Sequence, residues 1–141
     1  MSSSLPVVLG VLVAALAVAF VIGRLMTRRR GILRSTPATP AGVDAAELGL
    51  PPGRPAIVHF SAVWCGPCAG VRRVVDQVCA ELPEVAHVEI DMDDDPAAAR
   101  RLSVLSLPTT FVFDRDGRQR HRTSGVPKAA DLRSALEPLL G

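Results

Sequence analysis

The chain has 141 residues, enough for one domain of ordinary size and an appendage but not for two domains that each bury a good core. Residues 1–53 hold five arginines against two acidic residues, and residues 54–141 hold eleven Lys or Arg against twelve Asp or Glu. The basic excess therefore lies near the N-terminus, outside the larger part of the chain. This distribution excludes a basic nucleic-acid-binding domain, so we expect no nucleic-acid partner.

An apolar segment opens the chain. Residues 5–23 carry no charge, and a helix from Leu5 to Met26 is roughly 30 Å long, about the thickness of a bilayer core. A cleaved secretory signal has its basic residues before the apolar run, whereas here they follow it. They are Arg24, Arg28, Arg29, Arg30 and Arg34. We expect a single-pass membrane anchor over 1–26, with the N-terminus outside the cell membrane and the following domain in the cytoplasm.

Residues 27–53 begin basic and continue rich in Pro, Thr, Ala and Gly without periodicity, which predicts a linker. Within this linker Val43–Leu50 can form a short helical turn. The folded domain is expected over 54–141.

Strand-like and helix-like segments alternate through that domain. Asp95 followed by Pro96 predicts a helix start, and Asp116-Gly117 predicts a hairpin. The expected order βαβαββα indicates an α/β fold, with a mixed sheet covered by helices on both faces. The expected strands are Ala56–Ser61, Val85–Ile90, Thr109–Phe113 and Gln119–Thr123, and the expected helices are Ala69–Leu82, 95–102 and Ala129–Leu140.

Cys65 and Cys68 are separated by two residues and lie between a predicted buried strand and a helix. Such a pair can form and break a disulfide. At a helix N-terminus the dipole favours a thiolate, so we expect Cys65 to be the attacking nucleophile and Cys68, one turn later, the resolving thiol. A zinc site needs two further ligands, and neither Cys79 nor the three histidines form a second closely spaced pair, so no metal is expected.

Over residues 55–141 the chain resembles the thioredoxin family, through the full Trp64-Cys65-Gly66-Pro67-Cys68 sequence and a later Leu107-Pro108-Thr109. The resemblance implies a thioredoxin-like fold and a cis peptide bond before Pro108. It implies no cofactor other than the redox-active Cys65–Cys68 disulfide. It also implies a shallow apolar surface that docks protein substrates, formed by Trp64, Gly66, Pro67, Leu107, Pro108, Thr109 and Gly125.

Two positions depart from the family pattern. His59 stands where typical thioredoxins have a buried Asp, and His87 stands in place of a nearby Lys. An imidazole at position 59 can accept the Cys68 proton during resolution, as a proton relay. It can equally be a core histidine hydrogen-bonded to a backbone carbonyl, and both interpretations stay open.

The sequence thus predicts a membrane-tethered thiol–disulfide oxidoreductase that reduces protein disulfides and serves cell redox homeostasis. The resemblance implies thioredoxin reductase as electron donor, and a membrane electron carrier is compatible with the anchor. One alternative is the same enzyme on the other side of the membrane, acting on secreted or cytochrome-maturation proteins. Another is a thioredoxin-like binding module whose cysteines are incidental.

Overall fold

The computed structural model describes residues 4–28, 31–35 and 45–141. The chain divides into two compact units, Met1–Arg30 and Gly31–Gly141. In the first unit, helix α1 (Ser4–Arg28) includes a stretch, Leu5–Thr27, with a mean hydropathy of 2.9 and no residue buried against other parts of the protein. By length and composition this helix could cross a membrane. It extends two residues beyond the predicted anchor, to Arg28.

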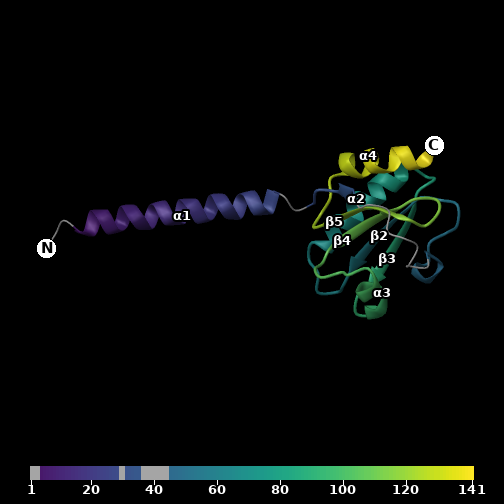
Figure 1. Cartoon of the computed structure of the whole chain (residues 1–141), viewed down its shortest axis with the longest axis horizontal. Helices are drawn as coiled ribbons and strands as arrows, with labels where there is room; N and C mark the ends of the chain where they lie inside the picture. Colours follow the sequence, from purple (N-terminus) through teal and green to yellow (C-terminus); the bar gives the residue numbers. More distant parts are fainter. Residues whose placement is uncertain (1–3, 29–30, 36–44) are drawn as a thin grey trace. The chain divides into compact units, whose positions relative to one another are not determined.

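The second unit is built on a five-stranded mixed sheet with the order β1-β5-β4-β2-β3 (Figure 1). Strands β2 and β3 are parallel, and the other neighbours are antiparallel. The predicted order βαβαββα is confirmed, with one further strand added at the sheet edge. The strands are β1 (Arg34–Ser35), β2 (Ala56–Ser61), β3 (Ala86–Asp91), β4 (Thr109–Phe113) and β5 (Gln119–Ser124).

Helices cover both faces of this sheet, with α2 (Cys68–Glu81) and α4 (Ala129–Leu140) on one face and α3 (Pro96–Arg101) on the other (Figure 1). Successive residues of a strand point to opposite faces, and β2 is buried on both. Ile57 packs in the layer with α2 and α4, whereas Val58 packs in the layer with α3. By the same alternation His59 belongs to the α2 face, where the site lies.

The helix start predicted at Asp95 is confirmed. The Asp95 carboxylate accepts a hydrogen bond from the Ala98 backbone N–H at 2.9 Å, and Pro96 occupies the first helical turn. At the predicted hairpin the Asp114 carboxylate accepts hydrogen bonds from the backbone N–H groups of Asp116 and Arg118, and Gly117 has a φ of +74°. Glycine adopts this left-handed conformation without steric cost, so the turn follows from its sequence.

Part of the segment predicted to be a linker belongs to the folded unit. The Gly31 N–H donates to the Ser124 carbonyl at 2.7 Å, and β1 pairs with β5. Helix η1 (Ala45–Leu48), a 3₁₀ turn, buries Leu48 in the α3 layer. The compact unit therefore begins at Gly31, earlier than the expected residue 54. The sequence does not predict β1, because two residues are too few to show a period-2 pattern. This strand is defined by its pairing with β5. Residues 43–44 of the predicted helical turn lie outside the described residues.

Candidate active site

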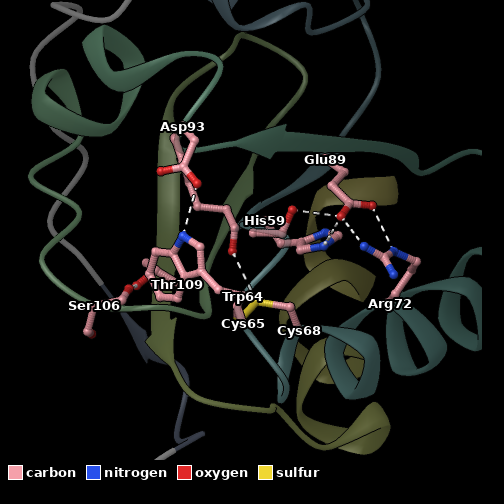
Figure 2. Close-up of a disulfide and its surroundings, with 11 residues drawn as sticks. His59, Trp64, Cys65, Cys68, Arg72, Glu89, Asp93, Ser106 and Thr109 are labelled. Carbon is pink, nitrogen blue, oxygen red and sulfur yellow. Dashed lines mark hydrogen bonds and ion pairs between the residues drawn. A yellow bond between two sulfur atoms is a disulfide. The ribbon is translucent and has the colours of Figure 1, made fainter.

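The two cysteines form a disulfide in the turn between β2 and α2, with their Cα atoms 5.5 Å apart (Figure 2). Helix α2 begins at Cys68, with Pro67 as its N-cap residue. Cys65 therefore lies in the turn that leads into the helix, just before its N-terminus. Proline fixes φ near −65° and lacks an N–H, which makes residue 67 a natural start for the helix.

The two sulfur-bearing residues differ in their access to solvent. Cys65 is partly exposed, whereas Cys68 is 2% exposed. The Cys68 sulfur also lies 3.9 Å from the Phe60 carbonyl oxygen, so it faces the backbone of β2. An external thiol or disulfide can reach only a sulfur that is open to solvent. This asymmetry favours Cys65 as the atom that exchanges with a partner and Cys68 as the atom that closes the internal disulfide.

Three loop segments surround the disulfide. The Leu107–Pro108 peptide bond is cis, as the resemblance implied, and the Pro108 carbonyl accepts a hydrogen bond from the Gly125 N–H at 2.9 Å. Gly125 has a φ of +89°, a conformation that favours glycine. The Trp64 indole N–H donates to Asp93 at 2.9 Å, which fixes the ring beside Cys65 while leaving it 65% exposed.

The residues expected to dock substrates fall into two groups. Trp64, Gly66 and Pro67 are exposed, and Leu107 and Gly125 are partly exposed. Pro108 and Thr109 are buried. The Thr109 hydroxyl donates to the Ser106 carbonyl at 2.7 Å, so this side chain supports the loop from beneath and forms no part of the open surface.

Three apolar side chains on the same loops escaped the sequence analysis. Val63 is 94% exposed, Leu105 is 91% exposed and Val126 is 40% exposed. Each lies one or two residues from a position already expected to dock substrates. A cluster of exposed apolar residues marks interaction surfaces. The sequence shows that these loops carry apolar residues, but whether such a side chain is exposed depends on tertiary packing.

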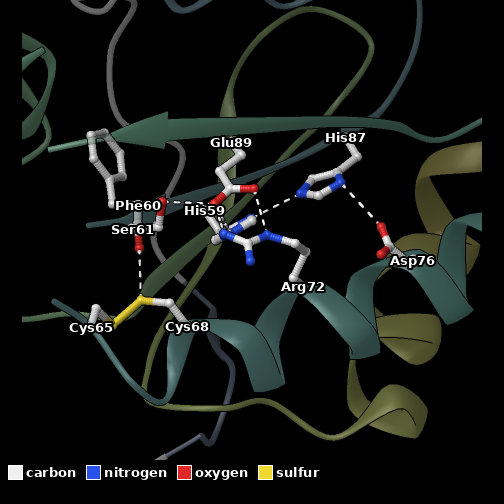
Figure 3. A network of polar contacts seen from close by, with 9 residues as sticks. All are labelled: His59, Phe60, Ser61, Cys65, Cys68, Arg72, Asp76, His87 and Glu89. Carbon is white, nitrogen blue, oxygen red and sulfur yellow. Dashed lines mark hydrogen bonds and ion pairs between the residues drawn. A yellow bond between two sulfur atoms is a disulfide. The ribbon is translucent and has the colours of Figure 1, made fainter. Parts of the chain in front are cut away.

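A polar network lies on the α2 face of β2 and β3. The Glu89 carboxylate accepts hydrogen bonds from the Ser61 hydroxyl at 2.7 Å and from the Arg72 Nε at 2.9 Å (Figure 3). The bonds from Arg72 hold the pKa of Glu89 at about 2, below its ordinary 4.5. His59, fully buried and opposite Glu89 in the strand register, has a pKa lowered by burial to about 4. At neutral pH His59 is therefore an uncharged base next to a carboxylate.

His59 does not fit the interpretation of a core histidine bonded to a backbone carbonyl. Its Nδ1 atom lies 2.8 Å from Nε2 of His87. Its Nε2 atom has no hydrogen-bond partner in the described part of the chain, and the nearest carboxylate oxygen, on Glu89, is 3.5 Å away. Sequence analysis singled out His59 and His87 but missed Arg72 and Glu89. The signal was available, because Arg72 follows Cys68 by one helical turn and Glu89 follows His87 by two strand residues.

Two other features weigh on the chemistry. Within residues 4–28, 31–35 and 45–141, no group of three or more His, Cys, Asp or Glu side chains is arranged to hold a metal ion. Cys79 is a half-buried free thiol beside the core that α2 and α4 share, and burial raises its pKa. A thiol with a raised pKa is a poor nucleophile at neutral pH, so Cys79 is unsuited to exchange.

A reactive pair made of one accessible and one buried cysteine sulfur, at the start of a helix and beside a cis-proline loop, defines a thiol–disulfide oxidoreductase. The family model named Thioredoxin matches residues 50–138, and the chain belongs to the thioredoxin family. It is 40% identical to a thioredoxin of Mycolicibacterium smegmatis over 90 residues, which cover 61% of this chain and 80% of that protein. A thioredoxin-like protein of Synechocystis is 38% identical over 93 residues, covering 65% of this chain and 88% of that protein.

Solved structures agree with the sequence relatives. The crystal structure of chloroplastic thioredoxin z superposes with a TM-score of 0.57 at 33% identity and covers 62% of this chain and 80% of that one. The Fasciola hepatica thioredoxin superposes with a TM-score of 0.55 at 34% identity, covering 62% of this chain and 83% of that one. The matched region corresponds to the second compact unit, so α1 has no counterpart in the family model.

Proposed function

We propose that this protein is a membrane-tethered reductase of protein disulfides, with Cys65 as nucleophile and Cys68 as resolving thiol. The observation that carries the proposal is the unequal exposure of the two cysteines, because it gives each sulfur one role. The fold and the relatives also support the proposal, because they are those of thioredoxins, proteins that use such a cysteine pair. The redox-active disulfide is itself the electron carrier, and no further cofactor enters the reaction.

The reaction proceeds in two exchanges. The Cys65 thiolate attacks one sulfur of the substrate disulfide, which forms a mixed disulfide and releases the first substrate sulfur as a thiolate that takes up a proton. Cys68 then loses its proton and attacks Cys65. The Cys65–Cys68 bond forms, the mixed disulfide breaks and the second substrate thiol leaves. The enzyme gives up two electrons, and the substrate disulfide gains them.

The open apolar surface around Cys65 serves to dock the substrate. Trp64, Leu107 and Gly125 have exposed apolar residues close by in the sequence, namely Val63, Leu105 and Val126. An extended substrate segment can lie across the cis-proline loop and pair with the backbone beside Pro108. Apolar residues that flank the substrate disulfide would be buried on contact, which favours unfolded or extended segments over folded, polar surfaces.

The membrane tether is supported by α1 and by the arginines that follow it. The stretch Leu5–Thr27 has the length and hydropathy of a membrane span. Arginines in excess on one flank favour the cytoplasmic side for that flank, so we place the redox unit in the cytoplasm. Reducing conditions there agree with a disulfide reductase. Electrons would reach it from thioredoxin reductase or from a membrane carrier.

Substitution of each cysteine in the full-length protein tests the chemistry. We expect Cys65→Ser to abolish reduction of a protein disulfide, and Cys68→Ser to accumulate mixed disulfides with its substrates on non-reducing gels. Cys79→Ser is the matched control and should keep full activity. No disulfide reduction by the parent protein, together with a cellular function that survives Cys65→Ser, would instead identify a binding module with incidental cysteines.

Topology needs a separate experiment. In intact cells, a membrane-impermeant thiol reagent should leave Cys65 unlabelled until the membrane is permeabilised, in a Cys79→Ser background. Labelling of Cys65 in sealed cells would contradict the cytoplasmic location. It would favour the alternative of an enzyme that serves secreted or cytochrome-maturation proteins.

A further inference from the structure

The short segment that precedes the redox-active part of the second unit lies at the rim of the active site. This segment, residues 31–35, is outside the region that the family model matches, residues 50–138. Its strand β1 pairs with β5 at the edge of the sheet (Figure 1), and β5 ends at Ser124. Residues 124–126, which we call the docking loop, carry Gly125 from the expected substrate surface. The segment therefore runs beside the docking loop.

Gly31 touches the docking loop at two points. Its N–H donates a hydrogen bond to the Ser124 carbonyl at 2.7 Å. A Cβ atom on residue 31 would overlap the Val126 carbonyl oxygen, so the backbone of Gly31 lies directly against the loop. Gly31 also has a φ of +86°, a left-handed conformation that favours glycine. Any other residue at this position must displace either the segment or the docking loop.

The docking loop is held from two other sides. The Gly125 N–H donates to the Pro108 carbonyl at 2.9 Å. A Cβ atom on Gly70, in the first turn of α2, would lie 3.3 and 3.6 Å from the two methyl carbons of Val126, so this side chain packs over the helix there. Gly31, the cis-proline loop and α2 therefore fix the docking loop together, and Gly31 is the contact that comes from outside the family region.

The two residues after Gly31 differ in burial. Leu33 is half-buried and packs against the core that α2 and α4 share, which anchors the segment. Ile32 is 52% exposed, although it stands between a buried glycine and a half-buried leucine. It follows directly the residue that touches Val126, another apolar side chain, which is 40% exposed. Apolar area at this point can be covered by a bound partner, and its burial would favour binding.

We propose that residues 31–33 take part in substrate recognition. Gly31 positions the docking loop, and Ile32 contacts an apolar side chain in the extended substrate segment that flanks the disulfide. The inference rests on the proposed function, because it names the side-chain chemistry that the same site prefers in its substrate. Gly31 acts through the docking loop and is a positioning residue. Neither residue takes part in the exchange at Cys65 and Cys68.

The way the segment is attached supports this role. A flexible linker needs neither a glycine at a left-handed φ nor a leucine packed on the core beside it. Residues 31–33 combine a backbone hydrogen bond, a close approach to the docking loop and a core contact. These contacts fix Ile32 next to the docking loop, so an apolar contact made there costs little further conformational entropy.

Gly31→Ala in the full-length protein tests the positioning role. We expect KM for a protein disulfide to rise roughly fivefold, because the new methyl group displaces the docking loop. The value of kcat should stay within about twofold, and kcat/KM for a small aromatic disulfide should not change. Gly49→Ala is the matched control, since Gly49 also has a positive φ, +73°, but no atom lies within 4 Å of the position of its Cβ. It should leave KM unchanged.

Ile32→Ser tests the contact with substrate. Two peptide disulfides that differ at one position beside the cysteine, Leu in one and Ser in the other, serve as substrates. We expect KM to rise roughly fivefold for the Leu peptide and less than twofold for the Ser peptide, since the apolar contact exists with the first alone. Arg34→Ser changes another exposed residue of the same segment and should leave both KM values as they are.

The results separate recognition from a structural role and from the chemistry. If Ile32→Ser leaves KM unchanged, or raises it equally for both peptides, the inference is overturned while the proposed function stands. A folded Gly31→Ala protein that loses activity equally on protein and small disulfides also overturns it. Because Ile32 is exposed, Ile32→Ser decides the question even where Gly31→Ala does not fold. Failure of the parent protein to reduce either peptide contradicts the proposed function itself.

Discussion

His59 and Glu89 are directly opposite each other in the register of β2 and β3, and the His59 Nε2 atom lies 3.5 Å from the Glu89 Oε1 atom. Glu89 is held instead by Ser61 and Arg72. The buried imidazole therefore stands beside a carboxylate that is already satisfied. Burial keeps His59 uncharged although the Glu89 carboxylate raises its pKa, and this makes the stability of the fold depend on pH.

Stability should fall as the pH falls from about 6.5 toward 4. The pKa of His59 is 6.5 in an unfolded chain and about 4 in the fold, so the unfolded state binds the proton first on acidification. The contribution of His59 to the free energy of unfolding is fully present above pH 6.5 and amounts to at most about 3 kcal/mol. Urea unfolding, followed by the fluorescence of the single tryptophan, measures it. His59→Asn should flatten the curve in this window, and His121→Asn should keep most of the slope. A slope that is unchanged in His59→Asn would assign it to other groups.

The pKa of Glu89 should rise toward 4.5 when Arg72 is replaced by Gln. In the parent protein, hydrogen bonding from Arg72 is the largest cause of the lowered pKa of Glu89. In the variant that bonding is lost, whereas burial still raises the pKa. Stability from this group is present above pH 4.5 and is lost toward pH 2 in the parent protein, and the variant, whose folded-state pKa lies nearer 4.5, should lose less stability over this window. Carboxyl carbon NMR measures the titration. Arg73→Gln, the exposed neighbour on α2, should leave the Glu89 pKa as it is.

Leu105→Ser should weaken the reduction of protein disulfides and spare small ones. The side chain is 91% exposed, so the folded unit should lose little stability. Burial of an apolar side chain against a substrate is worth about 1 kcal/mol or more, which corresponds to roughly a fivefold decrease in kcat/KM. Assays with a protein disulfide and an aromatic disulfide compare the two cases. An equal decrease for both substrates would indicate damage to the chemistry and not to docking.

Asp95→Ala should destabilise the fold by about 1 kcal/mol, the usual cost of losing an N-cap side chain. The carboxylate satisfies the Ala98 N–H at the start of α3, and alanine offers no acceptor in its place. The midpoint of urea unfolding measures the loss. Asp94→Ala removes an exposed neighbouring carboxylate outside the cap and should have a much smaller effect, so equal losses would rule out capping.

Much of the fold could be predicted from local patterns. The helix at Ala129–Leu140 and the strands at Ala56–Ser61 and Thr109–Phe113 have the bounds that periodicity indicated. The Cys65–Cys68 pair was predictable because two nearby cysteines between a strand and a helix have few other uses. Strand β1 was not predictable, since two residues carry no pattern and become a strand only through β5.

By itself the sequence determined the order of the elements, the chemistry of Cys65 and Cys68 and the apolar first helix, because each depends on residues close together in the chain. The tertiary structure alone decided which cysteine is accessible, which loop residues are open, and what surrounds His59. Burial and side-chain contacts depend on segments far apart in the sequence. Asp76, His87 and His59 belong to a helix and two strands, and only the packing of α2 on the sheet brings them into one row.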